Sequence, residues 1–127
     1  MNNVNRFALA VALVLPTALA AVPAAPAKDG DVRRAGRCTA ASRSKIKLSE
    51  ENGRIEVEFE VDQNRVGVRW NVVLRKYGAV IRRASRITRA PSGSFELRAL
   101  TANRAGADRI TATATRAGER CSAAASF

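Results

Sequence analysis

The chain has 127 residues, two cysteines, no histidine and a formal net charge of +11, with 22 lysines and arginines against 11 acidic residues. Without histidine it lacks the commonest general base and metal ligand, and neither a Cys-x-x-Cys pair nor a glycine-rich phosphate loop occurs. These features exclude most nucleophile–base and metal-dependent enzymes. We expect no catalytic residues, no metal site and no cofactor.

Residues 1–27 have the organisation of a cleavable secretory signal peptide. A short segment with one cation precedes the apolar run FALAVALVLPTALA, and Ala25-Pro26-Ala27 follows with the small-x-small pattern of a cleavage site. The run is shorter than the roughly 20 residues of a membrane-spanning helix. Cleavage is expected after Ala27, with Ala20 as the alternative, and no later segment is apolar enough to span a membrane. The mature chain is therefore expected to be secreted or associated with the cell wall.

Residues 28–37 have the polar composition of a flexible lead-in, and residues 38–127 have the length of one domain. Cys38 stands near the start of this domain and Cys121 near its end. An exported protein with an even number of cysteines most simply forms a disulfide, and a small domain gains stability from such a link. The sequence predicts a Cys38–Cys121 disulfide.

From Cys38 onward, apolar and polar residues alternate with a period of two, which is typical of half-buried strands. Asn52-Gly53 and Tyr77-Gly78 indicate tight two-residue turns between such strands. No segment has the periodicity of an amphipathic helix. The alternation predicts seven strands, at residues 44–48, 54–62, 66–76, 79–88, 95–99, 110–115 and 120–127.

Seven short strands with turns every eight to twelve residues favour an all-β fold, an antiparallel β-sandwich. The cysteines agree with this fold, because the first and last strands commonly lie side by side in such sandwiches. The alternation also predicts which side chains face the core, and the residues expected there include Val57, Phe59, Trp70, Val72, Leu74 and Ile110.

Seven strands with Trp70 on the third resemble the immunoglobulin or fibronectin type III sandwich. The stretches RIEVEFEVD, WNVVLR, RAPSGSFELR and GADRITATA, followed by a cysteine, are similar to small secreted actinobacterial proteins of unknown function. That group implies no activity. An immunoglobulin-like arrangement implies that the fifth strand lies beside the second and the sixth beside the third. The chain departs from true immunoglobulin domains, because the strands that carry their disulfide offer Val57 and Ala112 here.

The strand RIEVEFEVD at residues 54–62 gathers four of the eleven acids. Its three glutamates alternate with apolar residues and so share the face opposite the core. The neighbouring strands bring cations alongside them, and glutamates beside lysines on an open face have no reason to split their pKa values as catalytic carboxylates do. We interpret this stripe as a solvated face of mixed charge, made of Glu56, Glu58, Glu60, Lys45, Lys47, Arg98 and Glu96.

Between Gln63 and Phe95 there is no acid but there are eight cations. A two-residue turn at Tyr77-Gly78 pairs residue numbers that sum to 155, so that Leu74 opposes Ile81 in the expected hairpin. In this register four arginines share the outer face, namely Arg69, Arg75, Arg82 and Arg86. It also points Arg83 inward, so either Arg83 extends to solvent at the rim or the register shifts by one residue near that end.

The sixth strand would add Thr111, Thr113 and Thr115 to this arginine face. Guanidinium groups bind phosphate and carboxylate in bidentate fashion. We therefore expect a monomeric, non-catalytic module that binds an anionic envelope polymer, with an extracellular protein partner, bound at a sheet edge, as the alternative. Sequence-specific nucleic-acid binding is disfavoured because few aromatic residues are free to stack on bases. A purely compositional origin of the arginines, in a GC-rich genome, stays open.

Overall fold

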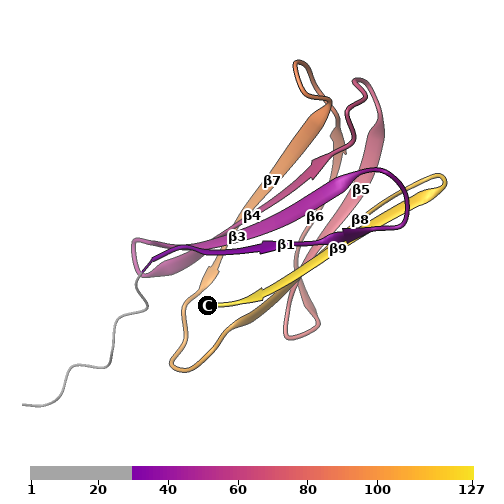
Figure 1. Cartoon of the computed structure of the whole chain (residues 1–127). Coiled ribbons are helices and arrows are strands. Elements are labelled where there is room, and N and C mark those ends of the chain that lie inside the picture. The colour runs from indigo at the N-terminus through magenta and orange to yellow at the C-terminus, as the bar shows by residue number, and fades with distance from the viewer. Residues whose placement is uncertain (1–29) are drawn as a thin grey trace, which may run out of the picture.

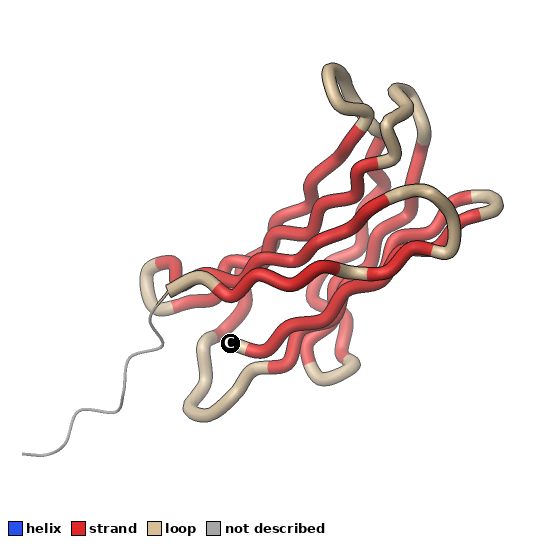
Figure 2. The backbone as a smooth tube through the Cα atoms, in the orientation of Figure 1, coloured by secondary structure: helices blue, strands red, loops and turns tan. Residues whose placement is uncertain are grey.

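A computed structural model describes residues 30–127, which form nine strands and no helix (Figures 1 and 2). None of these residues belongs to a helix long and apolar enough to cross a membrane. The expected signal peptide lies outside the described residues. The strands are β1 (Val32–Ala35), β2 (Arg37–Cys38), β3 (Arg43–Glu51), β4 (Arg54–Asp62), β5 (Arg69–Lys76), β6 (Ala79–Ile87), β7 (Ser94–Ala102), β8 (Arg109–Arg116) and β9 (Glu119–Ser126).

The strands form two antiparallel sheets that pack face to face (Figure 1). Sheet A has the order β1-β3-β4-β7, and sheet B has the order β2-β9-β8-β5-β6. The pairings of β7 with β4 and of β8 with β5 agree with the sequence predictions for the fifth and sixth strands. The all-β class and the two-sheet arrangement are thus as expected.

The inward side chains of both sheets meet in one core, as the period-two alternation requires. Trp70 of sheet B lies against Phe95 of sheet A, with ring centroids 6.1 Å apart. Its indole Nε1 donates a hydrogen bond of 3.0 Å to Gln63 Oε1, so the one polar atom of this buried ring is satisfied. The predicted core residues are all at most 1% exposed, namely Val57, Phe59, Trp70, Val72, Leu74 and Ile110.

The structure differs from the prediction at the N-terminal end, where two short strands raise the count from seven to nine. Val32–Ala35, expected in the flexible lead-in, pairs with β3 of sheet A, and Arg37–Cys38 pairs with β9 of sheet B. The chain passes from one sheet to the other at Gly36, whose amide donates to the Ser44 carbonyl. These strands were missed because two to four residues are too few to show a period.

The predicted disulfide links Cys38 to Cys121 across the β2–β9 pair. It joins residues 83 positions apart and attaches the N-terminal segment to the last strand. At the other end of the molecule, Lys76 Nζ lies 3.0 Å from Asp108 Oδ1, and both side chains are buried. This ion pair attaches the loop after β7 to the end of β5.

Candidate binding surface

The β5–β6 hairpin turns through Tyr77 and Gly78, as predicted, with positive φ angles of 48° and 81° that suit a type I′ turn. The two residue pairs nearest the turn keep the predicted register. A β-bulge between Leu74 and Arg75 then shifts the pairing by one residue, so that Leu74 opposes Arg82 rather than Ile81. Ile81 packs against the core, as the predicted register also placed it.

This shift overturns half of the predicted arginine face. Arg82 and Arg86 oppose Leu74 and Trp70, so their side chains leave β6 on the core side of sheet B rather than on its outer side. Arg83, which the uniform register pointed inward, opposes Val73 and lies exposed on the outer side. The sequence prediction was wrong for Arg82 and Arg86, because a single inserted residue exchanges the two faces of a strand.

Arg82 and Arg86 lie instead along the side where β6 of sheet B approaches β7 of sheet A. Arg82 Nη1 donates to the backbone carbonyl of Arg98 on β7. Arg86 lines a hollow that it shares with Glu60 and Glu96. These two arginines therefore belong to an edge of mixed composition.

The outer side of sheet B nevertheless carries six arginines, which we call the basic face. Two of them, Arg69 and Arg75, are sequence-predicted, and the cross-strand pairs place Arg75 beside Thr111 and Arg120 beside Thr115. The three predicted threonines of β8 run through the middle of this face. Its arginines are Arg37, Arg69, Arg75, Arg83, Arg109 and Arg120.

No carboxylate faces the basic face within residues 30–127. The acids nearest in sequence to its strands are Asp108 and Glu119, and both are buried. None of the six arginines forms an ion pair with a described residue; the polar contact that they show is Arg69 Nη1 donating to Ser85 Oγ at 3.0 Å. Five of the six residues are exposed, and Arg75 is half-buried.

The outer side of sheet A differs from the basic face, because several of its cations form ion pairs with acids. Lys47 lies 3.4 Å from Glu58, and Arg98 lies 3.0 Å from Glu58 on the other flank. A side-chain hydrogen bond to Glu96 and the charge of that residue, with Glu58 adding to them, raise the pKa of Arg98 above its ordinary value. The interpretation of the glutamate stripe as a mixed-charge face is confirmed.

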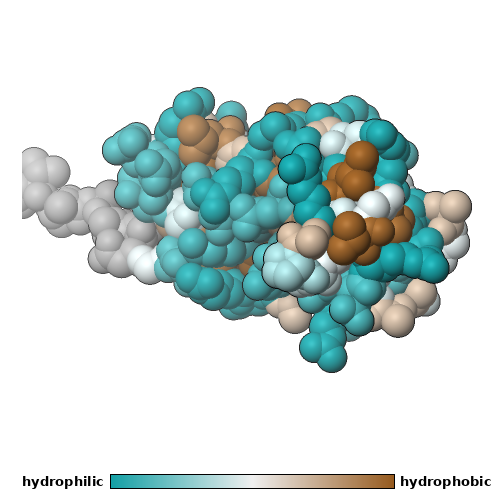
Figure 3. Space-filling model, turned by 90° about the horizontal axis from the view of Figure 1, so that it is seen from above, coloured by the Kyte–Doolittle hydropathy of each residue, from teal (hydrophilic) through white to brown (hydrophobic). Residues whose placement is uncertain are grey.

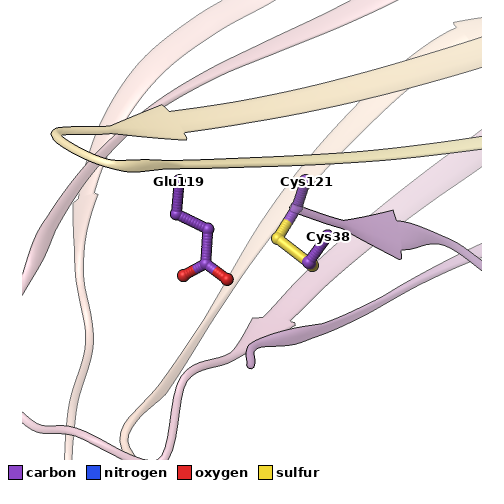
Figure 4. A group of neighbouring side chains, drawn as sticks. All are labelled: Cys38, Glu119 and Cys121. Carbon is purple, nitrogen blue, oxygen red and sulfur yellow. A yellow bond between two sulfur atoms is a disulfide. The ribbon is translucent and has the colours of Figure 1, made fainter. Parts of the chain in front are cut away.

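Cys38, Cys121 and Glu119 bring two sulfurs and a carboxylate within 4.8 Å of one another (Figure 4). Both sulfurs are consumed by the disulfide, so they are not the thiolates that metals bind. Glu119 accepts hydrogen bonds from the amide and hydroxyl of Ser42, at 3.0 and 2.7 Å, and from Arg116 at 3.2 Å. Burial raises the pKa of Glu119, but these hydrogen bonds outweigh it and hold that pKa below its ordinary value.

This charged group closes one end of the core. The Arg116 guanidinium lies 5.4 Å from the centre of the Trp70 ring while it bonds Glu119. Ser42 and Arg116 both bond Glu119, so the group stabilises the sandwich, although Arg116 Nε is buried without a hydrogen-bond partner among the described residues.

Sequence reasoning missed four arginines of the basic face. Arg83 was assigned to the inner face because the bulge was not predicted, and Arg37 lay in the segment expected as a flexible lead-in. Arg109 and Arg120 had a usable signal, because each has the outward parity of its strand. Comparison of the chain with protein-family models, with curated proteins and with solved structures found no match.

Proposed function

We propose that this protein is a non-catalytic binding module that associates with anionic polymers of the cell envelope through the basic face of sheet B. The observation that carries the proposal is the segregation of charge between the two sheets. On sheet A, Arg33, Lys45, Lys47 and Arg98 form ion pairs with acids, whereas the six arginines on the outer side of sheet B form none with a described residue. A guanidinium group forms bidentate hydrogen bonds with phosphate and carboxylate groups, and threonine hydroxyls add donors between the arginines.

The proposal includes export as a monomer to the outside of the cell, removal of the signal peptide and residence in or near the wall. The disulfide supports this location, since such bonds persist in oxidising compartments. The proposal also includes an immunoglobulin- or fibronectin III-like sandwich of actinobacterial type. The pairing of β7 with β4 and of β8 with β5 supports this part.

A basic surface that extends over several strands suits a polymer better than a small substrate. The two strands at the centre of the basic face, β8 and β5, contribute threonines and arginines but no aromatic side chain to it. Trp70 is buried, and Tyr77 lies in a turn. Nucleobases would find nothing to stack on, so the backbone charge of a polymer is the feature that this face recognises.

The test is to measure binding of the domain to polyphosphate and to polygalacturonate, as phosphate and carboxylate polymers, at several salt concentrations. Replacing two arginines of the basic face, Arg69→Gln with Arg75→Gln, should weaken binding and lower the slope of log K against log salt by roughly 1.4. The matched control removes two cations of sheet A, Arg33→Gln with Lys45→Gln, and should change binding little.

Equal losses in both double variants would show that net charge, and not the basic face, drives the binding. Preference for one polymer would identify which anionic group the arginines select. Absence of salt-dependent binding to either polymer would refute the proposal.

A further inference from the structure

The two sheets have four edges, and only two of them are long. β1 and β2 have four and two residues, whereas β6 and β7 have nine each. A long unpaired edge exposes a row of backbone amides and carbonyls that can pair with another strand, and proteins usually protect such edges. The two long edges, β6 and β7, are protected to different extents.

The backbone groups that point outward follow from the hydrogen bonds at the strand ends. The amide of Thr88 donates to the carbonyl of Val68. Because backbone groups in an antiparallel pair alternate between facing the partner strand and facing away from it, every second residue of β6 before Thr88 bonds β5. Tyr77 donates to the carbonyl of Arg109, which likewise shows that the odd-numbered residues of β5 bond β8. The residues of β6 whose backbone groups point away from the sheet are therefore Val80, Arg83, Ser85 and Ile87.

The edge of β7 is covered in part by groups from the β5–β6 side of the molecule. Gln63 donates to the carbonyl of Gly93, so by the same alternation the residues of β7 whose backbone groups point outward are Ser94, Glu96, Arg98, Leu100 and Ala102. Glu96 and Leu100 have no covering contact from a described residue, but the other three do. Ser94 exchanges backbone hydrogen bonds with Arg89. The carbonyls of Arg98 and Ala102 accept from the side chains of Arg82 and Lys76, respectively.

The edge of β6 has no such cover within residues 30–127. The one contact to its outward backbone groups is local, from Arg86 Nη1 to the carbonyl of Ser85 at 3.1 Å. Val80 and Ile87, near the two ends of the strand, are 42% and 40% exposed although both are large and apolar. Seen from above, the molecule is mainly hydrophilic, with apolar residues in a few separate groups (Figure 3).

We propose that the open edge of β6 adds an extended, acidic segment of a partner protein as a further strand of sheet B. The backbone of Arg83, Ser85 and Ile87 would form the main-chain hydrogen bonds of such an addition. Charge complementarity defines the segment: carboxylates would face Arg83 on the outer side and Arg82 and Arg86 on the other.

A second copy of this chain fits the edge poorly. Two β6 strands that pair antiparallel about Ala84 would place Arg82 directly opposite Arg86 on both sides of the centre. Like charges opposed across strands are destabilising. In this register the arginines disfavour self-pairing, whereas they favour an acidic strand.

The probe is a synthetic nine-residue peptide in which pairs of glutamates alternate with pairs of valines, so that carboxylates lie on both faces of the added strand. It is added to the whole domain. Amide hydrogen exchange of Arg83, Ser85 and Ile87 should be fast in the free protein and become protected when the peptide binds. The control peptide has the same sequence with N-methyl groups on three consecutive central residues, which keeps every carboxylate but removes amide donors from both of its edges. It should protect none of these amides.

Ser85→Pro removes one outward donor of β6 without removing a bond to β5, and proline is tolerated at such edge positions. It should weaken peptide binding about tenfold, whereas Ser85→Ala, which keeps the amide, should remain within about twofold of the original. Thermal melting of both variants checks that the fold is retained.

Several outcomes would overturn the inference. They are equal binding of the methylated peptide, unprotected β6 amides at saturation, or protection of the same amides by self-association without peptide. This test can fail independently of the polymer proposal. The double variant Arg82→Gln with Arg86→Gln should weaken binding of the peptide and leave binding of polyphosphate nearly unchanged. Polyphosphate itself should not protect the β6 amides.

Discussion

Removing the disulfide with Cys38→Ala and Cys121→Ala should strongly destabilise the fold. The bridge closes a loop between residues 83 positions apart, for which the chain-entropy model gives about 4.5 kcal/mol at 25 °C. Unfolding entropy is about 2.1 cal/mol/K per residue, so the melting temperature of a domain of this size should fall by roughly 20 °C. Alanine is the suitable replacement because Cys121 is fully buried and serine would add a polar group to the core.

The assay is thermal and guanidinium unfolding followed by circular dichroism. The double variant is compared with the unaltered protein, both oxidised and fully reduced. Reduction and substitution should lower the melting temperature by similar amounts, because both act mainly by releasing the unfolded chain. A fall of only about 5 °C would refute the loop-closure reasoning, since it corresponds to only about 1 kcal/mol.

Three further substitutions test individual contacts. Gly36→Ala should lower stability by about 1–3 kcal/mol in denaturant unfolding, because the new Cβ would lie 2.4 Å from the carbonyl oxygen of Ser122; unchanged stability would contradict the close approach of the sheets there. Glu119→Gln should destabilise near neutral pH by about 1–3 kcal/mol. Because folding lowers the pKa of Glu119, its ionised form stabilises the fold above the ordinary glutamate pKa of about 4.3, and this stabilisation is lost as the pH falls below that value. The free energies of unfolding of the variant and the original protein should therefore converge in acid. A difference that stays constant with pH would refute the assignment. Lys76→Met should cost about 3–5 kcal/mol by leaving the Asp108 carboxylate buried without its lysine, and a rise in melting temperature would contradict this.

The strands and their faces could be predicted from the sequence because each long strand shows the period-two pattern over several residues. The glutamate stripe follows directly: once β4 alternates, Glu58 must face outward, and a tight hairpin must bring Lys47 beside it. The same reasoning correctly placed Arg69 and Arg75 on the outer side of sheet B.

The bulge in β6 could not be placed from the alternation alone. The neighbours Val80 and Ile81 are both apolar and Arg82 and Arg83 are both charged, so the strand has no single parity in this region. That break in the pattern was the available signal. Ile81 faces the core with or without the bulge, so its burial does not place the bulge, and the shift at Arg82 and Arg83 depends on tertiary contacts. The N-terminal strands depend on tertiary contacts in the same way.

The separation of charge between the two sheets is tested most directly by following the arginine Nε–Hε resonances while polyphosphate is added. The largest shifts should fall on basic-face arginines such as Arg69, Arg75 and Arg120. Arg33 and Arg98, on sheet A, should move little, and the shifts should reverse as salt is raised and the screening length falls below about 8 Å. Shifts centred on sheet A, or spread evenly over all arginines, would contradict a polymer-binding face on sheet B.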